Sequence, residues 1–113
     1  MSLRKIALSL VCLLSFQASA VSNTDQFILG AWRANEALGS HYTLEFEKSG
    51  KFSLSFNNAV SEEGRWRTTN GDTLVVQISV PQGVPTQTCK INLQNVMLTV
   101  SGCIYQGRYA RIR

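Results

Sequence analysis

Side chains that could perform acid–base or nucleophilic chemistry are few in this sequence. His41 is the only histidine, and no motif ties a serine or cysteine nucleophile to it. Glu45 and Glu47 form one pair of carboxylates, and Glu62 and Glu63 form another. Paired carboxylates can cleave glycosidic bonds, but Glu45 and Glu47 alternate with apolar residues, as on the solvated face of a strand. We therefore expect no catalytic residues and no enzymatic activity.

The N-terminus has the organisation of a secretory signal peptide. Residues 1–20 contain two basic residues, an apolar stretch and an Ala-Ser-Ala cleavage sequence that ends at Ala20. We expect a mature domain of residues 21–113 that is periplasmic or secreted and has no stable membrane insertion after cleavage. Cys12 leaves a lipid-anchored form open, although the residues before it lack the small residue that lipidation usually needs.

Charge argues against nucleic acid as a partner. The chain carries 11 basic and 7 acidic residues, a net charge of +4. Arg4 and Lys5 leave with the signal peptide while every acidic residue stays, so the net charge falls to +2. An exported protein with so small a charge lacks the electrostatic footprint of a nucleic-acid-binding domain.

The elements that must position these residues are short strands. Polar and apolar residues alternate in about eight segments, with no convincing helix; the segments are 27–34, 41–47, 51–56, 64–68, 73–80, 88–93, 96–100 and 103–112. Glycine-containing turns join several of them, and residues 57–63 are expected to be a loop. Tight turns favour an up-and-down meander, and closure removes its exposed edges. The sequence predicts an all-β, small antiparallel barrel, with an open flat meander as the alternative.

Cys89 and Cys103 are the two cysteines left after signal cleavage. An even pair in an oxidising compartment predicts one disulfide. The bridge can close only if the strand between them stops short, and Ser101-Gly102 offers that stop. Bridged cysteines and a single histidine do not make a metal site, so no metal or other cofactor is expected.

Gly30-Ala31-Trp32 opens the first expected strand, and Arg108 and Arg111 lie in the last one. This order resembles the small bacterial lipocalin-like domains, which are themselves similar to true lipocalins. The resemblance covers about residues 28–113. It implies that an arginine, Arg111 or as second choice Arg108, packs over Trp32 at one barrel end in a cation–π contact. True lipocalins are much longer and end with a helix that this chain has no segment to supply.

The lipocalin resemblance implies a small apolar ligand inside the barrel. Aromatic side chains expected on the inner faces are the candidate ligand contacts: Tyr42, Phe46, Phe52, Phe56 and Trp66. These rings also occupy much of the interior, and no polar residue is consistently placed among the inner positions. A filled core and a hollow one are both consistent with the sequence.

Ser101-Gly102-Cys103-Ile104-Tyr105 is similar to the Ser-Gly-x-x-Tyr loop of exported bacterial lysozyme inhibitors. Those inhibitors are also small barrels, often with one disulfide. The similarity implies that Ser101, Gly102 and Tyr105 contact a protein partner. The second motif of that group, a tyrosine followed by Lys-Gly, is not evident here.

Together these features predict an exported, non-enzymatic, lipocalin-like binding protein for a small apolar ligand. The alternative is a periplasmic inhibitor or immunity-type protein that binds a cell-wall hydrolase such as lysozyme. The expected partner is accordingly a small apolar molecule or an envelope protein.

Overall fold

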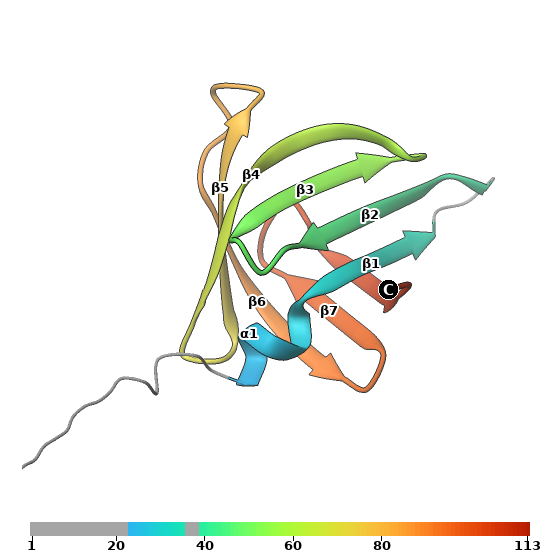
Figure 1. The fold of residues 1–113 in the computed structure, drawn as a ribbon, viewed down its shortest axis with the longest axis vertical. Helices are drawn as coiled ribbons and strands as arrows, with labels where there is room; N and C mark the ends of the chain where they lie inside the picture. The colour runs from blue at the N-terminus through green and yellow to red at the C-terminus, as the bar shows by residue number, and fades with distance from the viewer. Residues whose placement is uncertain (1–22, 36–38) are drawn as a thin grey trace, which may run out of the picture.

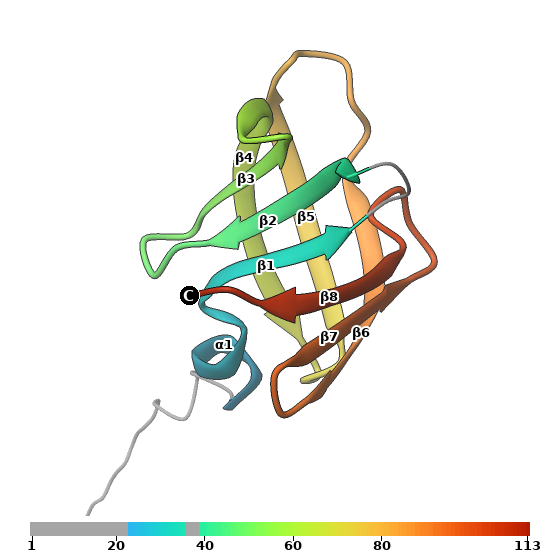
Figure 2. The same cartoon turned by 90° about the vertical axis from the view of Figure 1, so that its right-hand side faces the viewer.

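Eight antiparallel strands follow one another in chain order and close into a barrel, because β8 pairs with β1 (Figures 1 and 2). The computed structural model describes residues 23–35 and 39–113. The elements are α1 (Asn23–Ile28), β1 (Gly30–Asn35), β2 (His41–Phe46), β3 (Lys51–Phe56), β4 (Ala59–Thr69), β5 (Thr73–Val80), β6 (Gln87–Gln94), β7 (Met97–Ser101) and β8 (Gly107–Arg111). The predicted closed up-and-down barrel is confirmed. The expected signal peptide, with Cys12, lies outside the described residues.

The two ends of the barrel differ. At one end, here called the closed end, α1 lies beside the start of β1 and contacts β4 and β6 (Figures 1 and 2). Ile28 of α1 is fully buried in the core. The opposite end, here called the open end, carries the β3–β4 turn and the loops 81–86 and 102–106.

The middle of the barrel is filled. Strand alternation sends every second side chain inward, and the largest fully buried ones are Trp32, Phe46, Phe52, Leu44 and Leu98. The Phe46 and Phe52 rings lie 5.5 Å apart between centroids. Of the two interiors that the sequence left open, the structure has the packed one at its centre.

Residues 57–63 are not a loop, as predicted, but a tight turn followed by the start of β4. Asn57 and Asn58 have φ angles of 50° and 70°, which asparagine tolerates and which a two-residue hairpin needs. The β3–β4 register then shifts, since Leu54 pairs with Glu62 while Ser55 pairs with Val60. This bulge interrupts the period-two pattern, so the prediction of a strand over 64–68 missed residues 59–63 at the start of β4.

Two other boundaries differ from the prediction. The segment before β1 forms the short helix α1, whose six residues are too few to give a helical period. The last strand begins at Gly107 rather than at Cys103, because Cys103 is bonded to Cys89 and Tyr105 turns into the core. Within residues 23–35 and 39–113, no helix has the length and apolar character needed to cross a membrane.

Candidate functional site

A hollow of about 570 Å³ lies at the open end. Its wall comes from the end of β1, the start of β2, β3, the 102–106 loop and the start of β8. It consists of Ala34, Asn35, Tyr42, Leu54, Ile104, Tyr105, Gln106, Gly107, Arg108 and Tyr109. The volume falls in the range of small-molecule sites, about 300–1,000 Å³. Apolar side chains form part of the wall, and phenol, amide and guanidinium groups form the rest.

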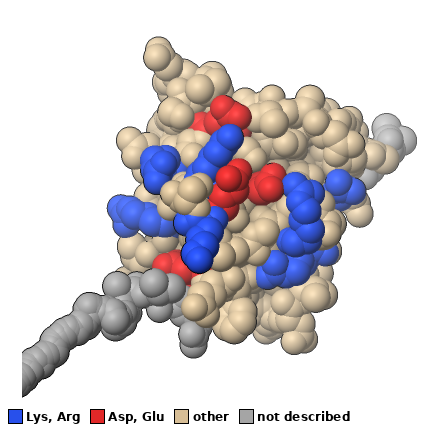
Figure 3. Space-filling model, viewed as in Figure 1, with Lys and Arg blue, Asp and Glu red and all other residues tan. Residues whose placement is uncertain are grey.

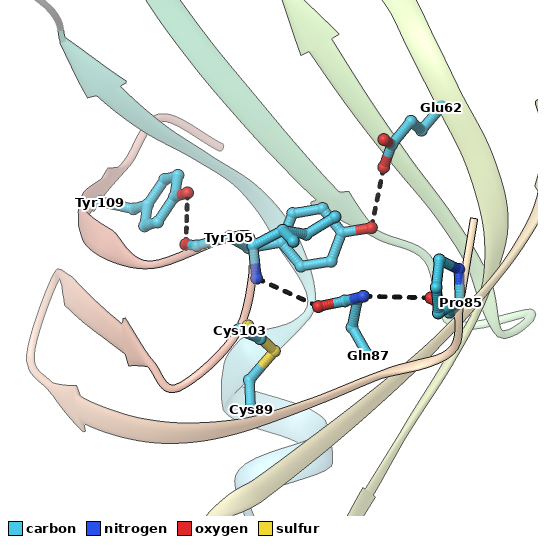
Figure 4. The surroundings of a disulfide bond; sticks show 8 residues. Glu62, Pro85, Gln87, Cys89, Cys103, Tyr105 and Tyr109 are labelled. Atoms are coloured by element: carbon cyan, nitrogen blue, oxygen red, sulfur yellow. Dashed lines mark hydrogen bonds between the residues drawn. A yellow bond between two sulfur atoms is a disulfide. The ribbon is translucent and has the colours of Figure 1, made fainter.

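The 102–106 loop, which supplies Ile104, Tyr105 and Gln106 to this wall, is held at several points (Figure 4). The Cys89–Cys103 disulfide anchors it to β6, with the Cα atoms 5.2 Å apart. The Ile104 amide donates a hydrogen bond to Gln87 Oε1 at 3.1 Å, and Gln87 Nε2 donates to the Pro85 carbonyl at 3.1 Å. The predicted disulfide is confirmed, and it joins β6 to the loop that follows the end of β7 at Ser101. A disulfide indicates an oxidising, non-cytoplasmic setting.

Tyr105 points into the barrel rather than outward. Its ring lies 5.3 Å from that of Phe52 between centroids, and its hydroxyl donates to Glu62 Oε1 at 2.8 Å (Figure 4). The Tyr109 hydroxyl donates to the Tyr105 carbonyl at 2.7 Å. Burial, and next the hydrogen bond and negative charge of Glu62, raise the pKa of Tyr105 far above its ordinary value. Tyr105 therefore remains a neutral hydrogen-bond donor.

This orientation corrects the surface-loop hypothesis for Tyr105. Only 3% of Tyr105 is exposed, so it offers almost no area to a protein partner. Ser101, the last residue of β7, and Gly102, in the bend that follows, are exposed. Of the three residues in the Ser-Gly-x-x-Tyr resemblance, two lie on the surface and the third is part of the core.

The five aromatic candidates for ligand contact lie in different parts of the barrel. Tyr42 lines the open-end hollow, and its ring contacts Phe56 with centroids 4.9 Å apart. Phe56 is 39% exposed, because it ends β3 at the barrel rim. Phe46 and Phe52 are buried in the packed centre and do not line the hollow.

Trp66 lies near the closed end, away from the open-end hollow. Its indole Nε1 donates to the Glu47 carbonyl at 2.9 Å, and its ring meets Phe46 edge-on. It borders a second hollow, of about 540 Å³, between α1 and the β2–β3 turn. Trp66 therefore cannot act together with Tyr42 on one small ligand.

Trp32 is fully buried near the closed end, with the Arg111 guanidinium carbon 4.3 Å from its ring centroid. The Trp32 indole N–H donates to the Ile28 carbonyl at 2.8 Å, and Arg111 Nη1 donates to the Leu29 carbonyl at 2.7 Å. Arg108, the second choice for this role, is exposed beside the open-end hollow. The arginine over the tryptophan thus ties β8 and β1 to the segment that closes the barrel.

Sequence reasoning missed two polar residues that face inward near the open end. Glu62 is the register partner of Leu54, and Gln87 is the register partner of Val76. The inward orientation of both residues could have been found by alternation along their strands. Glu62 lies four residues before the inner residue Trp66, and Gln87 lies two residues before the inner residue Cys89. The expectation that no polar residue is placed among the inner positions was therefore wrong.

The other candidate acid–base groups have ordinary partners on the barrel exterior. The His41 ring lies 3.2 Å from Asn58 Oδ1. Glu45 pairs with Arg113 at 3.1 Å, and Glu63 pairs with Lys51 at 3.8 Å. Within the described part of the chain, no three histidine, cysteine or acidic side chains gather in a way that could hold a metal ion.

Comparison with known proteins bears on the fold. The structure is similar to the NMR structure of a protein from Bacteroides thetaiotaomicron VPI-5482, with a TM-score of 0.61 and 17% sequence identity. The similarity covers 79% of this chain and 92% of that chain. It is a similarity of fold. No protein-family model and no curated protein matches the sequence.

Proposed function

We propose that this chain is an exported, non-enzymatic, lipocalin-like binding protein that holds a small, mostly apolar ligand at the open end of its barrel. The observation that supports this most directly is the 570 Å³ hollow above a packed core. Leu54 and Ile104 would contact the apolar body of the ligand, and Tyr42 would orient it. The ligand would sit in the mouth of the barrel and not in its centre.

Export is supported by two independent features. The N-terminal residues have the pattern of a signal peptide, and the Cys89–Cys103 disulfide suits an oxidising compartment. Within that setting we propose a periplasmic or secreted location. A disulfide that anchors the wall of the binding site would then form before the protein meets its ligand.

Binding without catalysis, and without nucleic acid, is supported by the charged groups. His41, Glu45 and Glu63 make exterior contacts with neighbouring side chains. On the face seen in Figure 3, lysine and arginine side chains are interspersed with aspartate and glutamate. Mixed charge of this kind does not favour a polyanion.

The test is fluorescence titration of residues 21–113 with N-phenyl-1-naphthylamine, an apolar probe that brightens when it leaves water. We expect saturable binding at one site, and Ile104→Asp should weaken it about fivefold or more, since a charge replaces apolar contact area. Val96→Asp is the matched control, because Ile104 and Val96 are both 59% exposed but Val96 lies in the β6–β7 turn at the closed end. Equal binding by both variants and wild type would exclude the open end as the site.

A protein-binding role is the second candidate, and exposed apolar residues at the open end favour it. Phe56, Val60, Val80 and Ile104 are 39%, 58%, 56% and 59% exposed. Exposed apolar side chains that form a patch are typical of interaction surfaces, although Phe27, Val96 and Ile112 are also exposed elsewhere on the described barrel. An inhibitor of a cell-wall hydrolase would use this rim together with Ser101 and Gly102.

A lysozyme turbidity assay separates the two candidates. Inhibition of lysozyme that Val80→Asp abolishes would support the inhibitor, because Val80 lies on the rim but does not line the hollow. Under the small-ligand proposal, Val80→Asp leaves binding of the naphthylamine probe unchanged.

A further inference from the structure

Glu62 brings a carboxylate to the inner side of the barrel wall. It pairs in register with Leu54, which faces inward, and it is half-buried. One oxygen, Oε1, accepts the hydrogen bond from the Tyr105 hydroxyl at 2.8 Å. Removing a carboxylate from water costs free energy unless hydrogen bonds or a cation compensate.

A single hydrogen bond from a neutral phenol is weak compensation for this charge. The ion pairs between described residues are Lys51 with Glu63, Lys90 with Asp72, and Arg113 with Glu45, and none includes Glu62. The neighbouring Glu63 differs, since it faces outward and has Lys51 as its partner. Glu62 is thus an inward-facing carboxylate to which the described part of the chain supplies no cation.

Glu62 is not one of the residues that line the open-end hollow, but it is linked to the hollow's wall. Two residues of the hollow's wall adjoin it, Leu54 across the β3–β4 pair and Tyr105 through its hydroxyl. Directly opposed side chains on paired strands have Cβ atoms about 4.5–5.5 Å apart. A molecule packed against Leu54 therefore brings its head group within reach of Glu62.

We infer that the ligand of the open end is a small amphiphile with a positively charged head group, such as a primary ammonium, which Glu62 binds while Leu54, Tyr42 and Ile104 contact the apolar body. The inference rests on the proposed binding function and names its ligand class. Hydrogen bonds between an ammonium and a carboxylate are charge-assisted and are stronger than neutral ones. Tyr105 holds one carboxylate oxygen in place, and the other accepts from the ligand.

Arg108 is the charge that opposes this arrangement. It borders the hollow, but it pairs with Thr99 on the outward side of the β7–β8 ladder and is exposed. Water and salt screen an exposed charge far more than a half-buried one. If Arg108 held the head group instead of Glu62, the ligand would be an anion. The charge of the preferred head group therefore distinguishes binding by Glu62 from binding by Arg108.

The experiment uses three probes of matched chain length: octylammonium, octanol and octanoate. Each is titrated into a complex of residues 21–113 with N-phenyl-1-naphthylamine, and displacement of the fluorophore is measured at pH 7. We expect octylammonium to bind about tenfold more tightly than octanol, and octanoate to bind most weakly. Glu62→Gln should remove the preference for octylammonium over octanol, because the amide oxygen still accepts from Tyr105 but carries no charge.

Glu63→Gln is the matched control, since it makes the same change one residue away on the outer face, and the preference should persist. The order in which the wild-type protein binds the three probes tests the inference by itself, even if Glu62→Gln folds poorly. Equal binding of octylammonium and octanol, or preference for octanoate, would overturn the cationic ligand while the binding function stands. If no probe displaces the fluorophore, or the fluorophore itself does not bind, the binding function fails and the inference fails with it.

Discussion

Arg111 lies over the indole ring of Trp32, with its guanidinium carbon 4.3 Å from the ring centroid. The two residues are register partners on β8 and β1, the pair of strands whose joining closes the barrel. Both also donate hydrogen bonds to carbonyls of the segment 27–29. One contact thus links the first strand, the last strand and the helix that covers the closed end.

Arg111→Ala should lower the free energy of unfolding by about 2–3 kcal/mol. A cation–π contact contributes about 0.5–2 kcal/mol, and a hydrogen bond from a charged group about 1.5–3 kcal/mol, with partial overlap between the two. Urea denaturation followed by tryptophan fluorescence measures the loss. Arg108→Ala is the control, and because Arg108 is exposed it should change stability by no more than about 0.5 kcal/mol. Similar effects of the two substitutions would contradict a special role for Arg111.

The double substitution of Cys89→Ala and Cys103→Ala should lower the free energy of unfolding by about 3 kcal/mol. The cysteines are 14 residues apart in sequence, and a loop of about this size has that value in the chain-entropy model. The backbone amide of Ile104, held by Gln87, should also exchange hydrogen faster because its loop has lost an anchor. Unchanged exchange at Ile104 would show that Gln87 and Tyr105 hold the loop without the disulfide.

Tyr105 should make the protein sensitive to alkaline pH. Because its pKa is raised in the folded state, the neutral phenol's contribution to stability is complete below the ordinary pKa of about 10 and falls as the pH rises above it. At pH 11 the loss from this group is about 1.4 kcal/mol, the free energy of one pH unit. Urea midpoints at pH 8 and pH 11 measure it. The Tyr105→Phe variant should lose less stability between pH 8 and pH 11 than the wild type. Equal losses in the variant and the wild type would show that Tyr105 is not the source of the alkaline sensitivity.

Gly64→Ala should destabilise the barrel by on the order of 3 kcal/mol or more, because overpacking against the backbone cannot relax through side-chain rotation. A Cβ atom at this position would lie 2.0 Å from the Gln77 carbonyl oxygen and 2.8 Å from the Ile78 Cα. Thermal unfolding gives the comparison with Gly102→Ala. At Gly102 the space is open and only a φ of +80° opposes alanine, at about 1–2 kcal/mol. A milder effect at Gly64 than at Gly102 would mean that β4 and β5 can separate locally.

The sequence by itself predicted the all-β class and the disulfide, and its resemblance to lipocalin-like domains implied that Arg111, or as second choice Arg108, packs over Trp32. Alternation along β2, β3 and β5 is regular, and Asn70-Gly71 marks a turn that few other residue pairs adopt. Cys89 and Cys103 are the two cysteines of residues 21–113, and an even pair of this kind predicts one disulfide. The alternation and the Asn70-Gly71 turn are local features, and local patterns are what periodicity and turn chemistry reveal.

Tertiary structure alone decided where the site lies. The bulge in β4 hid the strand that turns Glu62 inward, and the bend after Cys103 carries Tyr105 into the core, although its motif suggested a surface loop. Phe46 and Trp66 read alike as inner aromatic residues, yet the first fills the barrel and the second borders its closed end. The period of a strand gives the face of each residue. Depth along the barrel axis depends on register and closure, which are set by contacts between segments distant in the chain.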